Sequence, residues 1–432
     1  MDNRYMKSHE LLDRARKVTP LGSQTYSKSY RYFCEGNSPA FLEKGNGCCV
    51  WDVDGNKYID FICALGPVTV GYNDQRINEA VIEQIKKGIS FSMATALEVE
   101  LAEKLTQILP CAEMVRFVKN GSDATTAAIR LARAYTNREY IAMSGYHGMH
   151  DWSIGTTANN KGVPKQVCEL TGTFEYNNAE SLKRLFEEHS GQIAAVILEP
   201  IQGNGPKEGF LEEIKSIAQA NGALLIFDEV VSGFRYALGG ATELYNVTPD
   251  LAAFGKGMGN GLPISVVAGK KDIMELIEHG VFISTTFGGE AASLAGAIET
   301  IKILEQPGTY EHIWKLGKQM LDGLKALIEK YNLGGVITVS GLPPHGGVSF
   351  DGKGSLDYLD INSIYQQNMI NSGILTVGIN NINLSHTENE ISSFLEAAET
   401  AMAAIASAIA ADSLEGILLG GKVNPVFKRN IT

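Results

Sequence analysis

The segment from Asn73 to Glu305 repeats one pattern that restricts its possible folds, because short apolar runs alternate with stretches of helical periodicity. The runs are VRFV, YIAM, AAVIL, LLIF and LAAF, and each leads directly into a polar or glycine-rich loop. Runs this short and apolar are typical of buried strands. Their alternation with helices indicates an α/β fold with a mostly parallel sheet and helices on both faces. The loops are expected to form one active-site rim, since carboxyl ends of parallel strands share one edge of a sheet.

The chain divides into three predicted parts. Residues 1–72 contain an arm, PLGSQTYSKSYRYF, that is expected to be extended, and then a small strand hairpin or meander. Residues 73–305 form the large domain that carries the rim, and residues 306–432 form a small C-terminal domain. Helices are expected over residues 75–87, 97–109, 122–136, 180–189, 211–220, 310–331 and 387–411.

An acid and an amine at this rim suggest its chemistry. Asp228 follows LLIF directly, and Lys256 follows LAAF within a Gly-Lys-Gly turn. Both therefore lie at strand carboxyl ends, where they can meet. A lysine nucleophile has to lose its proton through desolvation or a neighbouring positive charge, and a buried aspartate needs a cation to face. Taken singly, Asp228 could equally cap a helix or turn, and Lys256 could be a solvated loop lysine.

Pyridoxal phosphate (PLP) meets both needs at once. Its aldehyde condenses with a lysine to form a Schiff base, while its protonated ring nitrogen pairs with an acid and makes the ring an electron sink. The two residues together therefore predict a PLP site, with Lys256 and Asp228 as the catalytic residues.

Two motifs, FDEVVSGFR and FGKGMGNGLPIS, closely resemble those of the class III (subgroup II) aminotransferases, which have PLP fold type I. Within that family the chain is similar to the branch of glutamate-1-semialdehyde aminomutase, from about Pro20 to about Ala411. The resemblance implies a transaminase whose smaller α+β lobe is built from both chain ends. It further implies a homodimer with active sites at the interface.

The loop Asn120-Gly121-Ser122-Asp123 is a candidate phosphate cup. It lies between a strand and a helix, where backbone N–H groups, a small residue and the helix dipole favour an anion. Serine caps without any ligand are common, so the pattern alone leaves plain capping open. In the resembled family the matching loop holds the cofactor phosphate, which assigns Gly121 and Ser122 to that role.

Further cofactor contacts follow from the resemblance. Tyr146, in the motif Tyr146-His147-Gly148, would stack on the pyridine ring, although it could also be a core tyrosine. His147 could orient the site through hydrogen bonds, and its role stays open. Val230 would pack on the opposite ring face. Glu199 would lie near the ring and its hydroxyl group, or it could be purely structural.

One predicted contact crosses between subunits. Thr286, in STTFGGE, occupies the family position at which a threonine of one subunit reaches the phosphate in the other. That assignment requires the homodimer. An isolated Thr-Thr would otherwise indicate only a strand.

The expected reaction moves an amino group from an amino-acid donor, L-glutamate first among them, to an aldehyde or ketone. Lys256 would act as the base that moves the proton. For the substrate, the aminomutase arm carries Asn-Ser-Pro-Val-Arg, whose arginine holds a carboxylate, whereas this chain aligns Lys28 there with Arg31 nearby. Arg235 is a further candidate for a carboxylate, or a buried structural arginine.

Two departures disfavour the tetrapyrrole aminomutase. The Phe-Glu-Ala-Gly-Phe segment of that enzyme is replaced by GINNIN before LSHTENE, and the segment after Tyr146 is shorter than its lid. The QTYSK arm resembles enzymes of surface-polysaccharide pathways, which suggests a hydroxylated or sugar-like acceptor. An aminomutase or racemase is the alternative, and a non-catalytic PLP-binding protein is a more distant one.

Composition excludes several other partners. A net charge of −12 without a basic cluster argues against nucleic acid and anionic membranes. The start of the chain lacks an apolar signal region, and AMAAIASAIAA is too short to span a bilayer, so a cytoplasmic protein is expected. Its six cysteines lack metal-ligand spacing, which predicts reduced thiols and no metal site.

Overall fold

A computed structural model describes residues 3–424 of the chain. These residues separate into two compact units, a larger one of residues 75–310 and a smaller one that combines residues 3–74 with residues 311–424. The sequence-based division placed its boundaries after residues 72 and 305 and treated the two chain ends as separate parts. The predicted smaller lobe from both chain ends is confirmed, because the structure joins them in one unit.

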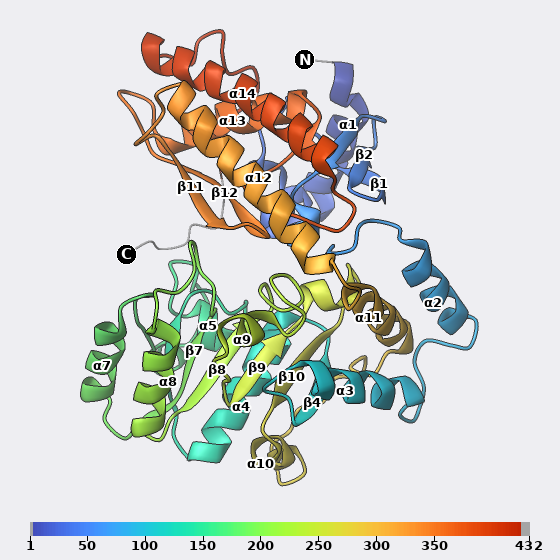
Figure 1. Cartoon of the computed structure of the whole chain (residues 1–432), viewed down its shortest axis with the longest axis vertical. Coiled ribbons are helices and arrows are strands. Elements are labelled where there is room, and N and C mark those ends of the chain that lie inside the picture. The colour runs from blue at the N-terminus through green and yellow to red at the C-terminus, as the bar shows by residue number, and fades with distance from the viewer. Residues whose placement is uncertain (1–2, 425–432) are drawn as a thin grey trace. The chain divides into compact units, whose positions relative to one another are not determined.

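The larger unit contains one sheet and the helices around it (Figure 1). Its strands are β4 (Met114–Val118), β5 (Tyr140–Ser144), β6 (Thr171–Thr173), β7 (Ile193–Leu198), β8 (Leu224–Glu229), β9 (Leu251–Phe254) and β10 (Ser265–Gly269). Its helices are α2 (Gln75–Ile85), α3 (Ala96–Ile108), α4 (Gly121–Thr136), α5 (Asp151–Ile154), α6 (Lys165–Cys168), α7 (Ala179–Glu188), α8 (Phe210–Ala220), α9 (Gly240–Tyr245), α10 (Lys271–Met274) and α11 (Ala291–Leu304).

The direction of the strands places their carboxyl ends at one edge. The strand order is β4-β10-β9-β8-β7-β5-β6, and β5 to β9 pair in parallel. Strand β10 is antiparallel both to β9 and to β4, so β4 points the same way as β9. Every residue of β5 and of β7 to β10 is buried, as expected for a sheet covered on both faces. The predicted mostly parallel α/β sheet is therefore confirmed.

The smaller unit contains two small sheets and long helices. Its elements are α1 (Met6–Val18), β1 (Leu42–Asn46), β2 (Cys49–Asp52), β3 (Lys57–Asp60), α12 (Thr309–Lys330), β11 (Ile337–Leu342), β12 (His345–Phe350), α13 (Tyr358–Asn371), β13 (Ile374–Leu375), β14 (Ile379–Asn381) and α14 (Glu388–Ala411). The sheets are ordered β1-β2-β3-β13 and β11-β12-β14. The arm after α1 was expected to be extended. That expectation is wrong, because the arm winds through three single 3₁₀ turns, at Pro20–Gly22, Tyr26–Lys28 and Tyr30–Tyr32.

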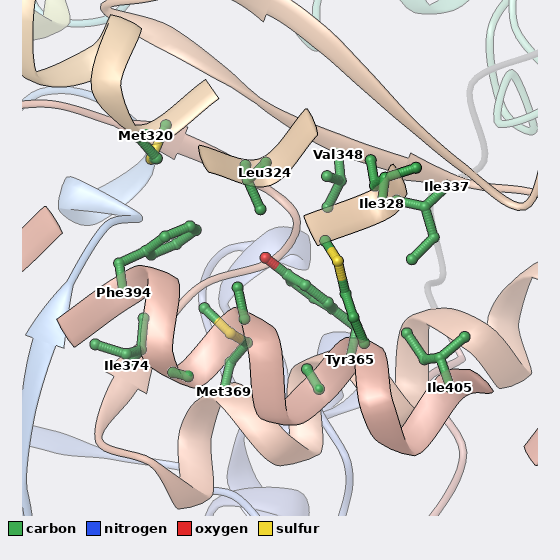
Figure 2. Packing of buried hydrophobic residues seen from close by; sticks show 14 of the residues in the cluster. Met320, Leu324, Ile328, Ile337, Val348, Tyr365, Met369, Ile374, Phe394 and Ile405 are labelled. Atoms are coloured by element: carbon green, nitrogen blue, oxygen red, sulfur yellow. The ribbon is translucent and has the colours of Figure 1, made fainter. Parts of the chain in front are cut away.

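The core of the smaller unit lies between its three long helices. Figure 2 shows side chains of α12, among them Leu324 and Ile328, pointing toward the same interior as Tyr365 of α13 and Ile405 of α14. Within residues 3–424, α14 is the one helix that is long and apolar enough to cross a membrane by length and composition. Its face from Ile391 to Ala408 packs into this core, and such packing accounts for its apolar character.

His386 gives the smaller unit a testable pH dependence. Its buried ring stacks on Phe61 with centroids 4.5 Å apart, and its Nδ1 accepts the backbone N–H of Asn383. Burial, the largest cause, lowers the pKa of His386 to about 4. An unfolded histidine titrates near about 6.5, so the unfolded chain binds the proton first as the pH falls.

We therefore expect the free energy of unfolding to fall between about pH 6.5 and about pH 4, by on the order of 3 kcal/mol from this group. His386→Gln keeps a polar side chain but removes the titration, so urea unfolding curves should show a smaller loss on acidification. The exposed His279 provides the matched control, because His279→Gln should leave the wild-type loss in place. Equal losses in wild type and His386→Gln would contradict the assignment.

Candidate active site

Asp228 and Lys256 lie at the carboxyl ends of adjacent strands. Asp228 is the fifth residue of β8 and is paired in register with Ala253 of β9. Lys256 follows β9 after Gly255 and begins a short 3₁₀ turn, Lys256–Gly259. The two chemically active residues predicted from the sequence therefore belong to neighbouring strands of one sheet edge.

His147 is the partner of Asp228. Its Nδ1 lies 2.8 Å from Oδ2 of Asp228, and its Nε2 lies 3.1 Å from the carbonyl oxygen of Ser144. A carbonyl oxygen can only accept, so Nε2 carries a hydrogen. A second proton then has to lie between Nδ1 and the carboxyl oxygen for that hydrogen bond to form. The role of His147, which the sequence left open, includes holding the acid in place through this shared proton.

The turn at Lys256 has an unusual backbone. Lys256 has a φ of +39°, in the left-handed region that non-glycine residues seldom occupy. Gly255 before it lies so close to Ser265 that a Cβ would come within 2.5 Å of the serine hydroxyl oxygen. Strained backbone of this kind clusters at functional sites, where the surroundings hold one side chain in a fixed direction. The glycine before Lys256 is thus explained by its packing against Ser265.

The first turn of α4 forms a second part of the rim. Asn120 caps this helix in a capping box with Asp123, whose carboxylate accepts the Asn120 N–H at 2.9 Å. The first N–H groups of a helix have no intrahelical acceptor, and the dipole favours an anion at this end. At Gly121 a Cβ would meet Cγ1 of Val230 at 2.8 Å, so glycine lets the loop after β8 approach the helix. The structure thereby brings Gly121, Ser122 and Val230 together.

Ser122 is held by the loop after β5. Its Oγ accepts the N–H of Met149 at 3.1 Å, and Thr125 donates its hydroxyl to the carbonyl oxygen of His147 at 2.8 Å. Gly148 has a φ of +108°, and a Cβ there would lie 2.8 Å from Cβ and 2.9 Å from Cα of Ser122. The Tyr-His-Gly motif therefore needs its glycine because it packs directly on the helix that carries Ser122.

Tyr146 and Glu199 also meet at this edge. The N–H of Tyr146 donates to Oε1 of Glu199 at 3.3 Å, and the tyrosine side chain is about one-third exposed. Gln202, which sequence reasoning did not select, donates its Nε2–H to the carbonyl oxygen of Ser144 at 3.0 Å. That carbonyl is also the acceptor for His147, so Gln202 supports the same loop. In the sequence, its position two residues after the Glu199-Pro200 pair is the feature that could have indicated this residue.

Sequence reasoning also did not select Glu229, the residue after Asp228, which has a structural role. It is fully buried, and its two carboxylate oxygens accept hydrogen bonds from Ser232, Ala241 and Thr242. Burial raises the pKa of Glu229, and these donors oppose the rise. The acid ties the start of α9 to the end of β8, and so it fixes the strand on which Asp228 lies.

Four predicted residues lie outside this cluster of contacts. Thr286 is in an exposed turn before α11. Arg235 is only 2% exposed, and such burial favours the structural alternative for this side chain. Lys28 and Arg31 belong to the smaller unit, where Lys28 lines a cavity of about 680 Å³ between the arm and the sheet that contains β2. Arg31 is half-buried, and its carbonyl oxygen accepts the N–H of Asn424.

The cluster in the larger unit has the parts that PLP requires. A helix N-terminus with close-packed glycines can receive a phosphate, a buried acid with a shared proton can face a ring nitrogen, and a lysine follows the adjacent strand. The contacts of Gly121 with Val230 and of Gly148 with Ser122 leave no room for a Cβ, so the loops after β8 and β5 pack closely on this helix end. The residues present therefore fit the cofactor.

This fold and rim define a PLP-dependent transaminase, and comparison with known families agrees. The model of the family "Aminotransferase class-III" matches residues 32–387. The chain therefore belongs to the class III aminotransferases.

Individual relatives support the same conclusion. The 3-aminobutyryl-CoA aminotransferase of Cloacimonas acidaminovorans is 41% identical over 360 residues, which cover 82% of this chain and 83% of the relative. The glutamate-1-semialdehyde 2,1-aminomutase of Desulforamulus reducens is 36% identical over 431 residues, covering 93% and 99%. Among solved structures, the omega-transaminase of Sphaerobacter thermophilus has a TM-score of 0.82 at 27% identity, covering 92% of this chain and 97% of that chain.

The close packing of Gly148 on Ser122 can be tested against a matched glycine. Gly148→Ala introduces both a positive-φ penalty of about 1–2 kcal/mol and an overpacking cost of about 1–3 kcal/mol against Ser122. Gly162 has a φ of +98°, and a Cβ added there would have no neighbour within 4 Å, so Gly162→Ala carries the backbone penalty alone. We expect the alanine at 148 to lower the free energy of urea unfolding more than the alanine at 162, and to weaken PLP binding. Equal effects of the two alanines on both quantities would contradict this role of the packing.

Proposed function

We propose that this transaminase takes its amino group from L-glutamate and passes it to an aldehyde or ketone, with a hydroxylated or sugar-like compound as the acceptor. The observation that carries the amino-transfer chemistry is the buried pair of Asp228 and His147 at the end of β8, beside the strand that leads into Lys256. Glutamate as the donor rests on the family resemblance.

Each side chain has a distinct task in this proposal. Bound PLP supplies an aldehyde for covalent attachment to an amine and a pyridine ring that withdraws electrons. Lys256 is the attachment point, and its Nζ takes and returns the proton that moves during amino transfer. Asp228 faces the ring nitrogen. Its Oδ2 is held by His147, and its Oδ1 accepts the N–H of Val230 at 3.1 Å.

The remaining contacts surround the cofactor. Gly121 and Ser122 receive the phosphate, a role that their place in the first turn of α4 supports. Tyr146 and Val230 cover the two faces of the ring. Glu199 orients the loop that carries Tyr146, and this task is supported by the hydrogen bond between them.

The acceptor proposal rests on the arm and on GINNIN. Lys28 replaces the arginine of the aminomutase motif, and the glutamate of the matching aminomutase segment is absent. Lys28 and Arg31 are assigned to an anionic group on a substrate. Arg235 remains a less favoured candidate, because burial of its side chain suits a structural role.

A second candidate is an aminomutase, which moves the amino group within one molecule. The relative of this name from Desulforamulus reducens matches over 93% of the chain. The 3-aminobutyryl-CoA aminotransferase is more similar in identity, at 41%, and its name makes a 3-oxo thioester a further acceptor to test. Glutamate-1-semialdehyde offered alone separates the classes, since only an aminomutase converts it without a second substrate.

The donor is tested by adding L-glutamate to the PLP-loaded protein. We expect its visible absorption band to shift to shorter wavelength while 2-oxoglutarate is released. Lys256→Ala should abolish both, because the attachment amine and the base are lost. Asp228→Asn should slow the conversion by a factor of about 100, equivalent to about 3 kcal/mol. Lys183→Ala on α7 is the control and should behave as wild type. A full conversion by Lys256→Ala would refute the assigned role.

We also propose that the enzyme is a homodimer whose partner subunit approaches the turn at Thr286. The proposal is supported by exposed apolar side chains around that turn. Met93 is 83% exposed, and Phe91 and Phe287 are each more than half exposed. The N–H of Ala291 donates to the carbonyl oxygen of Ile89, so the turn adjoins this apolar segment. A patch of this kind is typical of a subunit interface.

A charge placed in this patch should dissociate the dimer. For Met93→Lys we expect the dimer dissociation constant, measured by sedimentation, to rise about tenfold or more, because a lysine would have to be desolvated at the interface. Leu244→Lys, on α9, is the matched control and should leave the dimer intact. A monomeric wild-type protein, or an unchanged Met93→Lys dimer, would contradict the proposed interface.

A further inference from the structure

An ion pair links the candidate phosphate cup to the turn that carries Thr286. Lys119 comes directly before the cup loop, and its Nζ lies 3.0 Å from Oε2 of Glu290. The two side chains are only 16% and 13% exposed. Pairs on the open surface contribute little, but a largely buried one is costly to break because the remaining charge has no partner.

Glu290 is itself fixed by the helix that follows it. As the N-cap of α11 it accepts the N–H of Ala292 at 2.8 Å and that of Ser293 at 3.2 Å. Burial raises its pKa, but the hydrogen bonds from Ser293 and Lys119 together hold the pKa of Glu290 below its ordinary value. The carboxylate therefore stays ionised at neutral pH, and Lys119 is attached to a rigid anchor.

The turn before Glu290 is packed on the same elements. At Gly288 a Cβ would meet the carbonyl oxygen of Phe117 in β4 at 2.9 Å. At Gly289 it would meet the carboxylate carbon of Glu98 at 2.5 Å, and Glu98 closes the capping box of α3 with Thr95. The turn therefore has little freedom to move, and Lys119 is its charged connection to the cup.

We propose that Lys119 and Glu290 are positioning residues for the cofactor phosphate, with the ion pair holding the loop of Gly121 and Ser122 at the distance and angle that phosphate binding needs. The inference rests on the proposed cup. In this proposal Lys119 does not contact the phosphate directly. The simpler alternative is that the Lys119 cation attracts the phosphate anion.

The two ideas predict opposite results for one variant. Glu290→Gln removes the charge that holds Lys119 but keeps an oxygen that can accept the N–H groups of Ala292 and Ser293. If Lys119 only attracted the phosphate, releasing it would strengthen PLP binding. If the pair positions the cup, both Glu290→Gln and Lys119→Met weaken binding, and Lys119→Arg, which keeps charge and donors, restores most of it.

The experiment titrates cofactor-free protein with PLP and with pyridoxal, which lacks the phosphate, and follows absorbance. We expect Lys119→Met and Glu290→Gln to raise the dissociation constant of PLP about tenfold, the scale of one lost charged hydrogen bond, with that of pyridoxal unchanged. Lys270→Met is the control, because Lys270 pairs with Asp250 at the amino end of β9, the opposite edge of the sheet.

The outcomes are separable. Unchanged or tighter PLP binding by Glu290→Gln would overturn the positioning role. Equal weakening for PLP and pyridoxal would also overturn it, since the pair would then support the fold in general. If wild type itself binds PLP no better than pyridoxal, the proposed phosphate cup fails and this inference fails with it.

Discussion

The hydrogen bond between His147 and Asp228 is the interaction on which the rest of the site depends. It brings together the loop after β5 and the end of β8, and it fixes a proton between a carboxyl oxygen and an imidazole. The opposite ring nitrogen donates to Ser144, which also accepts from Gln202. Burying a carboxyl group costs free energy unless it is hydrogen-bonded, so this partner allows the acid to lie buried at the edge of the sheet.

The sheet makes this arrangement possible through the direction of its strands. Strand β10 runs against both of its neighbours, so β4 returns to the direction of β9 and its helix begins at the same edge as Asp228 and Lys256. If β10 were parallel to only one of its two neighbours, β4 would run against β9 and the N-terminus of α4 would open at the other edge. The anion-binding end of that helix and the acid would then lie on opposite sides of the sheet, and no single ligand could reach both.

The sequence predicted the five strands of the rim and seven of the helices, because each has an apolar period or an abrupt polar end. It did not predict β10, α11 or α13. Helix α11 is buried on nearly all sides, so its apolar residues show no face. Helix α13 buries polar residues such as Ser363 and Gln366, which a hydrophobic pattern assigns to the surface. At the site, residue types indicated Asp228 and Lys256, but the contact of Gly148 with Ser122 depends on tertiary packing that no local pattern contains.

The difference between features that follow from the order of elements and features that depend on tertiary packing also explains why the chemistry of this chain is better defined than its substrate. The acid, the amine and the helix N-terminus all lie at the carboxyl ends of strands of one sheet, so their relation is set by backbone hydrogen bonds and follows from the order of elements. Lys28 and Arg31 lie in a series of 3₁₀ turns in the smaller unit, outside this sheet. A change from arginine to lysine there preserves charge but loses the planar bidentate geometry that suits a carboxylate. If the arm contacts the substrate as proposed, selectivity can change there while the rim is retained, which agrees with relatives of 36–41% identity that carry the names of different activities.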